Sequence, residues 1–365
     1  MKKSLLALAV LGAFAGAASA QSSVTLSGTI DLAGRYVKND GQDRRVSMSN
    51  SGINSSQLVL SGKEDLGGGM YAGFVLNSQL AADSGNSGLG GKFWNRRSTV
   101  SLWGNFGEIR LGRDYTPTFW NNTLNDPYGT VGVGDSSNVA QLLAPTFVRA
   151  DNAIGYFLPA NIGGIYGQVM AAASEGAPLS TYTGTTVPNQ FAGNPGRYVG
   201  GRIGFAAGPF DIAGAYADQR FDRLPGAPSQ KTYNIGGSYN LGVVKLMGYY
   251  DRDSLSYAGF DKKDDRFSLG AVVPVGQGLI NAGYDRSKLT ATAPVAYTNT
   301  ISKFAVGYIY NLSKRTAVYS QVARLSNGSA SAVQIGGDTG GSPAGAPPVA
   351  GGKSTGFEFG LRHFF

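Results

Sequence analysis

The sequence predicts an all-β chain that closes into a sixteen-stranded antiparallel transmembrane barrel. Apolar and polar residues alternate over the last twelve positions, Ser354 to Phe365, and the same alternation recurs near the N-terminus. Such strict alternation indicates strands with one apolar face. No helical period elsewhere supplies a layer to cover that face, so the expected partner is outer-membrane lipid. Lipid requires a closed barrel, because open sheet edges are not tolerated in hydrocarbon.

The first twenty residues have the pattern of a secretory signal peptide. Two lysines precede a short apolar run, and small residues end at Ala18-Ser19-Ala20. This A-x-A site predicts cleavage before Gln21. The run is well short of the roughly 20 residues that a spanning helix needs, which disfavours a membrane anchor. We therefore expect a signal peptide at residues 1–20 and a barrel at residues 21–365.

The composition agrees with a membrane barrel and disfavours other classes of protein. The chain has 19 Tyr, 18 Phe and 55 Gly but only 15% charged residues, which suits aromatic girdles and tight turns. With no cysteine, disulfides and thiolate metal sites are excluded. The net charge of +8 is spread over short strands and loops without a basic helix, so no nucleic-acid partner is expected.

Segments of alternating polarity follow one another along the chain. In the first, Ser23 to Arg35, Val24 and Leu26 share one face and Asp31 lies on the other, which makes a lipid face and a water face. Tyr36 to Asn54 is expected to be a loop. The next five strands are expected at Ser55 to Lys63, Met70 to Gln79, about Asn95 to Trp103, Glu108 to Asp114, and Arg149 to Leu158.

Short turns alternate with long loops between these strands. Short turns are expected at residues 64–69, 104–107, 161–164, 208–209, 240–242, 275–278 and 311–315. Long loops are expected at residues 36–54, 80–93, 115–148, 174–195, 220–230, 253–264, 287–298 and 325–353. Fifteen connections join sixteen strands, and short periplasmic turns with long extracellular loops are typical of an outer-membrane barrel. The termini of such a barrel meet on the short-turn side, so Ser22 is expected near Phe365.

The sequence lacks the residues that catalysis and metal binding would need. The only histidine, His363, lies on the expected lipid-facing side of the terminal strand. A Ser-His-Asp site in the lumen therefore has no base, and metal clusters lack both cysteine and histidine ligands. We expect no enzyme activity and no cofactor.

Several short motifs occur in order across the mature chain. They are Ser22 to Gly28, Gly62 to Gly67, Arg97 to Leu102, Gly104 to Gly107, Leu111 to Asp114, Asn311 to Thr316 and Gly360 to Phe365. In this order they resemble the trimeric general-diffusion porins of Gram-negative outer membranes, most closely the anion-selective porins of beta-proteobacteria. The resemblance implies a homotrimer that passes small hydrophilic solutes and anions. Gly360, His363 and Phe365 resemble the signal that the barrel-assembly machinery recognises.

The resemblance also implies a constriction. The third loop, residues 115–148, is expected to fold into the barrel and narrow it. Arg96 and Arg149 match arginines that line the constriction in the anion-selective relatives. Strand alternation directs Arg97 rather than Arg96 to the lumen, and a bulge would reverse this, so both are candidates. Asp126 matches an acidic position that faces the arginines.

The sequence departs from the family pattern at two positions. Gln57 stands where the relatives carry a third constriction arginine, and Asn77 where they carry a glutamate, so the anion preference is expected to survive but weaken. Other basic residues share lumen parity, and each either adds to the pore field or pairs with carboxylates such as Asp31 and Asp251. These residues are Arg35, Arg110, Arg202, Lys245 and Lys303.

The function predicted is passive diffusion through a water-filled, anion-selective pore, and two alternatives are open. The first is a substrate-specific channel for phosphate, an organic acid or a sugar. In it, the third-loop aromatics Phe119, Trp120 and Tyr128 would form a sliding track, unless they pack against the wall. The second is a non-conducting barrel that acts as an adhesin through its long loops.

Overall fold

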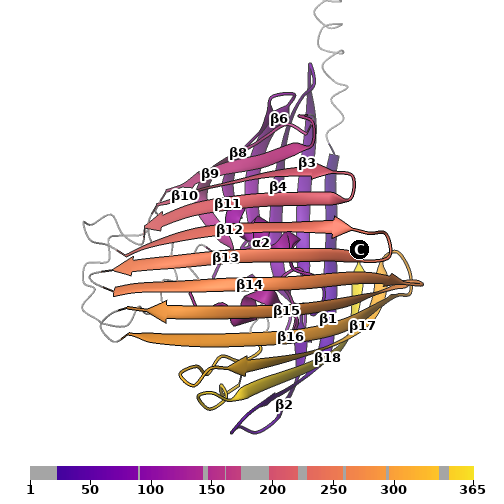
Figure 1. The fold of residues 1–365 in the computed structure, drawn as a ribbon. Helices are drawn as coiled ribbons and strands as arrows, with labels where there is room; N and C mark the ends of the chain where they lie inside the picture. The colour runs from indigo at the N-terminus through magenta and orange to yellow at the C-terminus, as the bar shows by residue number, and fades with distance from the viewer. Residues whose placement is uncertain are drawn as a thin grey trace, which may run out of the picture.

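The two ends of the chain meet and close an antiparallel sheet into a barrel (Figure 1). β1 (Ser23–Asn39) pairs with β18 (Lys353–Phe364) along one edge and with β3 (Gln57–Gly67) along the other. The computed structural model describes residues 23–88, 91–142, 147–160, 162–173, 197–220, 228–257, 260–292, 296–336 and 345–365. The predicted signal peptide at residues 1–20 lies outside the described residues. Because β1 pairs with β18, the described sheet has no open edge, and the backbone N–H and C=O groups of both strands are hydrogen-bonded, as hydrocarbon requires.

Sixteen strands form the wall, each antiparallel to its neighbours. Between β3 and β18 they are β4 (Met70–Ala81), β6 (Arg97–Gly104), β7 (Gly107–Tyr115), β8 (Arg149–Phe157), β9 (Ile165–Ala172), β10 (Tyr198–Ala207), β11 (Phe210–Arg220), β12 (Ser229–Asn240), β13 (Lys245–Tyr257), β14 (Phe260–Val275), β15 (Gly278–Ala291), β16 (Tyr297–Asn311) and β17 (Thr316–Asn327). Two short strands, β2 (Arg45–Asn50) and β5 (Asn86–Ser87), extend hairpins beside the wall. The predicted sixteen-stranded all-β barrel is confirmed.

Several sequence-based boundaries are wrong where strands run into expected loops. β2 forms inside the expected loop 36–54, and β13 and β14 extend through the expected loop 253–264. In β13 and β14, polar residues such as Arg252 and Lys263 point outward above the lipid, where water accepts them, so the strands continue without an apolar face. In β2 the alternation is complete, since Val46 and Met48 are exposed and Ser49 is buried. The expected pairing of Ser22 with Phe365 lies outside the described residues. Thr29 lies opposite Phe364, because the first residues of β1 extend beyond the seam and pair only with β3.

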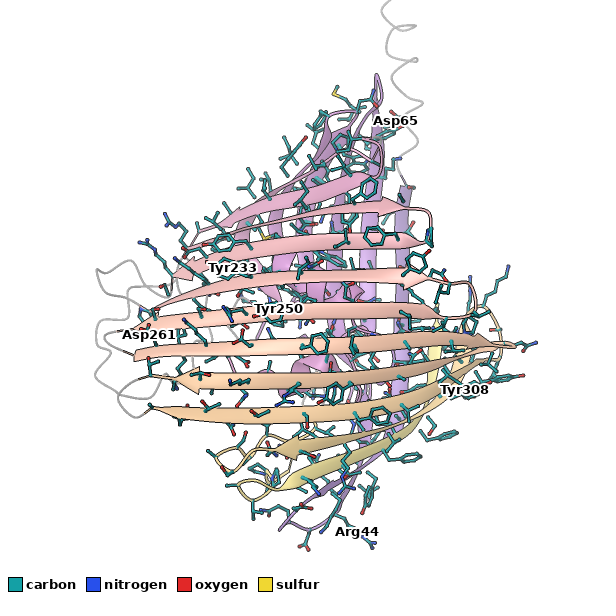
Figure 2. The ribbon with its side chains drawn as sticks, viewed as in Figure 1. Arg44, Asp65, Tyr233, Tyr250, Asp261 and Tyr308 are labelled. Atoms are coloured by element: carbon teal, nitrogen blue, oxygen red, sulfur yellow. The ribbon has the colours of Figure 1, made fainter. Side chains whose placement is uncertain are left out.

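Alternate residues of the wall strands meet the outside and the inside. On β18, Phe357 and Phe359 are 45% and 61% exposed, whereas Glu358 between them is fully buried. Tyr233, Tyr250 and Tyr308, labelled in Figure 2, are also exposed. Among the described residues, no helix has both the length and the apolar character to cross a membrane.

The third loop folds into the barrel and is fixed to its far wall. It contains α2 (Pro117–Leu124) and the short 3-10 helix η1 (Ser136–Val139), and α2 lies within the ring of strands in Figure 1. Thr116 caps α2 by accepting from the Phe119 N–H, and proline suits the first helical turn. Asn121 donates to the Ala213 carbonyl of β11 at 3.0 Å. The inward fold of loop 115–148 is confirmed for its described residues.

Gly360 of β18 allows a close approach that a larger residue would block. A Cβ there would lie 2.4 Å from Cζ of Tyr319 and 2.7 Å from the Leu32 carbonyl oxygen. Gly360→Ala is therefore expected to lower the free energy of unfolding by about 1–3 kcal/mol through overpacking, as measured by urea titration of the refolded barrel. Gly34→Ala on the paired strand is the control, since nothing lies within 4 Å of its Cβ position. Equal stability of the two variants would contradict this packing argument.

Candidate pore constriction

A cavity of about 710 Å³ lies between the third loop and the wall strands β3, β4 and β6. Trp120 and Thr130 line it from the loop, and Val75, Asn77 and Gln79 line it from β4. The loop is held in place on the other side of the lumen, where the Tyr128 hydroxyl donates to the Asn281 carbonyl of β15 at 3.1 Å. The open space therefore lies along the N-terminal strands.

Arg96, Arg97 and Arg149 all line this cavity. Arg97 is the first residue of β6 and faces inward by strand parity. Arg96 lies just before the strand, where parity no longer applies, and its N–H donates to the Asn77 carbonyl at 3.1 Å. The sequence left open which of the two arginines faces the lumen, and the structure places both there. The Arg97 Nε lies 3.5 Å from Asp114 Oδ1, which is a long contact for an ion pair.

Tyr115 connects the other two arginines. Arg149 lies opposite Tyr115 in the β7–β8 register and donates from Nη2 to the Tyr115 hydroxyl at 3.0 Å. The guanidinium carbons of Arg149 and Arg96 lie 4.5 Å and 5.9 Å from the centroid of the Tyr115 ring. Burial lowers the pKa of Arg96 to about 10, opposed by Tyr115 and reinforced by Arg149, so Arg96 is charged at neutral pH. The sequence analysis did not name Tyr115 as a pore residue. Tyr115 and Arg149 stand at the two ends of the third loop, so the sequence could have indicated that they lie next to each other.

Gln57 and Asn77, the two positions that depart from the family pattern, lie together on the cavity wall. Asn77 donates from Nδ2 to Oε1 of Gln57 at 3.0 Å. Both residues line the cavity with the arginines. A hydrogen bond between two neutral side chains thus occupies the place where the family pattern has an arginine and a glutamate.

Asp126 is not brought to the arginines. Its carboxylate accepts the backbone N–H groups of Tyr128 at 2.9 Å and of Thr130 and Ser136 at 3.0 Å, which organises the turn inside the third loop. The aspartate that lines the cavity is Asp135. A sequence match locates an acidic position but not the direction of its carboxylate, which is why Asp135 was missed.

The buried position of Asp126 predicts a pH dependence of stability. Burial, followed by the charges of Asp135 and Asp285, raises the pKa of Asp126 to about 6, with Lys303 opposing. A carboxyl whose pKa is raised on folding contributes its stability in full below about pH 4 and loses it as the pH rises through about 6. Asp126→Asn should therefore remove part of the difference in urea midpoint between pH 4.5 and pH 7.5. The exposed Asp43→Asn variant should retain the native difference, and equal behaviour of the two variants would contradict the expectation.

The other basic residues with lumen parity divide into two groups. Arg202 donates to Asn121 Oδ1 and to the Tyr166 hydroxyl, both at 3.1 Å, and Lys245 is half-buried near the start of β13. The remaining three pair with carboxylates, as the alternative interpretation allowed: Arg35 with Glu358 at 2.7 Å, Arg110 with Glu108 at 2.8 Å, and Lys303 with Asp285 at 3.2 Å. Lys303 also donates to the Gly134 carbonyl at 2.7 Å, so it fastens the third loop to β16.

The third-loop aromatics do not form a continuous track. Tyr128 is buried and packs on the wall, whereas Phe119, Trp120 and Tyr115 form a group beside the arginines. Trp120 is half-buried and lines the cavity. Tyr128 therefore packs against the wall, whereas Trp120 lies at the pore.

The C-terminal residues lie at the seam of the barrel. Phe365 exchanges two backbone hydrogen bonds with Gly28, at 3.0 Å and 3.1 Å. His363 is exposed on the outer face, and its Nδ1 lies 2.9 Å from Oγ1 of Thr316. This histidine is therefore far from the cavity lining, and Gly360 is packed beneath Tyr319 as described above.

Comparison with known proteins places the chain in a family. The sequence model of the Gram-negative porin family matches residues 7–330. Outer membrane porin protein 32 of Delftia acidovorans is 39% identical over 376 residues, with all of both chains covered. An outer membrane porin protein of Bordetella pertussis is 30% identical over 366 residues, covering 88% of this chain and 93% of that one.

Solved structures show the same fold. The anion-selective porin from Comamonas acidovorans superposes with a TM-score of 0.81 at 35% identity, covering 94% of this chain and 100% of that one. OmpT of Vibrio cholerae has the same fold with a TM-score of 0.67 at 12% identity, covering 94% of this chain and 98% of that one. The chain belongs to the Gram-negative porin family of outer-membrane proteins.

Proposed function

We propose that this outer-membrane porin is a passive diffusion channel with anion preference and no catalytic activity. The observation that carries the proposal is the charge of the cavity lining, where three arginines face one aspartate, Asp135. Rings of guanidinium groups favour anions, and the low-dielectric wall concentrates their field in the narrow section. The guanidinium groups of Arg96 and Arg149 lie against the Tyr115 ring rather than against a carboxylate, and both residues line the cavity.

The anion preference is expected to be weaker than in relatives with a third arginine. Gln57 contributes no charge, and its hydrogen bond to Asn77 leaves this part of the lining neutral. The similar porin from Comamonas acidovorans is described as anion-selective, which supports the sign of the preference. We assign the pore field to Arg96, Arg97 and Arg149, and give Asp126 a structural role in the loop.

We also propose how the protein is exported, inserted and assembled. Residues 1–20 would be removed on export, and the barrel-assembly machinery would recognise Gly360, His363 and Phe365 in the last strand. The exposed Phe359 and Phe365 on this strand support its recognition, since both rings are accessible. A homotrimer is proposed because OmpT of Vibrio cholerae, a protein of the same fold, has been solved in a trimer form.

Single-channel recording in planar bilayers tests the proposal against its two alternatives. The expected result is stepwise conductance that rises linearly with salt concentration. In a salt gradient, the zero-current potential is expected to have the sign that shows preferential passage of anions. Conductance that saturates as the salt concentration rises would favour a substrate-specific channel. Correctly folded protein that never conducts would favour an adhesin.

A further inference from the structure

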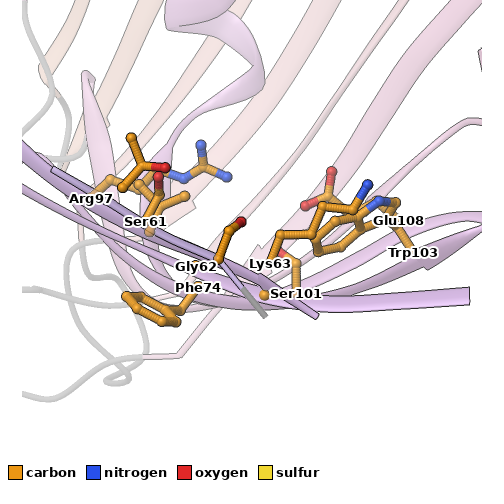
Figure 3. Close-up of a pocket in the computed structure, with 12 residues that line it drawn as sticks. Ser61, Gly62, Lys63, Phe74, Arg97, Ser101, Trp103 and Glu108 are labelled. Atoms are coloured by element: carbon orange, nitrogen blue, oxygen red, sulfur yellow. The ribbon is translucent and has the colours of Figure 1, made fainter. Parts of the chain in front are cut away.

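A second cavity lies next to the constriction along the same wall and shares lining residues with it. This second cavity has a volume of about 330 Å³ and is lined by Lys63, Trp103 and Glu108 at the short-turn end of β3, β6 and β7 (Figure 3). Arg97 and Ser61 line both cavities. A solute leaving the constriction thus meets Arg97 and then the second cavity.

Each cavity pairs a cation with aromatic rings. Lys63 and Trp103 line the second cavity, and together with the neighbouring Tyr71 we call them the wall station. The Lys63 Nζ lies 3.8 Å from the Tyr71 centroid and 5.9 Å from that of Trp103. The two rings stack with centroids 5.9 Å apart. Among the residues that the structure describes, no carboxylate lies within ion-pair distance of Lys63, and the nearby Glu108 is bound by Arg110.

The first, which we call the loop station (Arg96, Arg149, Tyr115 and Trp120), has the same chemistry. The Tyr115 and Trp120 ring centroids lie 5.3 Å apart, and both rings are half-buried. Both arginines line the cavity together with Trp120. A guanidinium donates charge-assisted hydrogen bonds to a carboxylate, and a ring attached to that carboxylate can lie against the aromatic side chains.

We propose that the two stations bind aromatic carboxylates, which therefore cross this pore by a saturable path. The inference rests on the proposed anion-preferring channel and goes beyond it, because a field of charges alone does not distinguish an aromatic anion from an aliphatic one. An inorganic anion uses the cations and leaves the rings unused. A neutral aromatic compound uses the rings and leaves the cations unpaired.

Benzoate and cyclohexanecarboxylate test this inference, since they carry the same charge on six-membered rings that differ in aromaticity. Each is added to single channels of the native protein in chloride solution, and the concentration that halves the chloride current is measured. Benzoate is expected to block at about fivefold lower concentration, from the known strength of aromatic pairs. Equal half-blocking concentrations, or the absence of block by benzoate, would overturn the proposal.

Two variants locate the effect. Trp120→Leu at the loop station and Trp103→Leu at the wall station are expected to lower the preference for benzoate, while open-channel conductance shows that each variant is folded. Phe304→Leu, on the exposed outer face of β16, is the matched control and should keep the preference. Loss in one tryptophan variant alone supports the proposal and identifies that station. Unchanged preference in both would overturn it.

The same recordings separate this inference from the proposed function. If the zero-current potential is anionic but benzoate is not preferred, the aromatic sites are refuted and the anion channel stands. If the potential is cationic, the anion channel is refuted and the aromatic sites with it.

Discussion

Arg149→Gln is expected to lower the chloride-to-potassium permeability ratio about fivefold, because a unit charge 4 Å from a passing ion is worth about 1 kcal/mol even in bulk water. Arg149 lines the constriction, its Nε is unpartnered, and its other contact is the neutral Tyr115 hydroxyl. Within the described part of the chain, no carboxylate therefore forms an ion pair that cancels its charge. The ratio is obtained from zero-current potentials of reconstituted channels in a potassium chloride gradient.

Arg324→Gln is the matched control for this experiment. Arg324 is exposed on the outer face of β17, so its replacement changes the net charge equally without touching the lumen. The control should keep the native ratio. Adding Arg96→Gln and Arg97→Gln to Arg149→Gln should remove the anion preference altogether. An unchanged ratio in Arg149→Gln, or an equal fall in Arg324→Gln, would show that the constriction arginines do not set the selectivity.

Arg266→Met is expected to cost about 3–5 kcal/mol of unfolding free energy, because it leaves two buried carboxylates without their cation. Arg266 on β14 donates from Nη2 to Asp253 at 2.8 Å and from Nε to Asp251 at 3.1 Å, and both aspartates are fully buried. Beside this cluster, Asp264 accepts the N–H of Gln141 at 2.7 Å and so anchors the third loop. Urea unfolding followed by tryptophan fluorescence measures the loss.

Arg252→Met tests whether burial is the cause. Arg252 and Asp265 form an ion pair at 2.6 Å on the outer face, with side chains 46% and 30% exposed. An exposed pair contributes only about 0–1 kcal/mol, so this variant should be nearly as stable as the native protein. Comparable losses in the two variants would contradict the argument from burial.

The barrel could be predicted from the sequence because its cause is local. Lipid and water select opposite faces of the same strand, so the pattern of Phe359, Leu361 and Glu358 is visible in a few neighbouring residues. The strand ends were less predictable. Above the lipid both faces of a strand meet polar surroundings, and the expected loop 253–264 is the extended hairpin of β13 and β14.

The pore lining was only partly predictable, because it depends on contacts between distant residues. The position of α2 depends on Asn121 meeting Ala213, 92 residues away, and no local pattern encodes that contact. Parity directed Arg97 rather than Arg96 to the lumen, but in the structure Arg96 precedes the strand and lines the cavity as well. The family resemblance located Asp126 as an acidic position, yet its carboxylate is used by backbone N–H groups inside the loop.

The zero-current potential of the native channel tests the central claim most directly. With a tenfold gradient of potassium chloride across a planar bilayer, an excess of unpaired guanidinium groups at the constriction predicts preferential passage of chloride, so the dilute side becomes negative. A positive dilute side would mean that potassium passes preferentially, and would contradict the assignment of Arg96, Arg97 and Arg149 as the groups that set the selectivity of the pore.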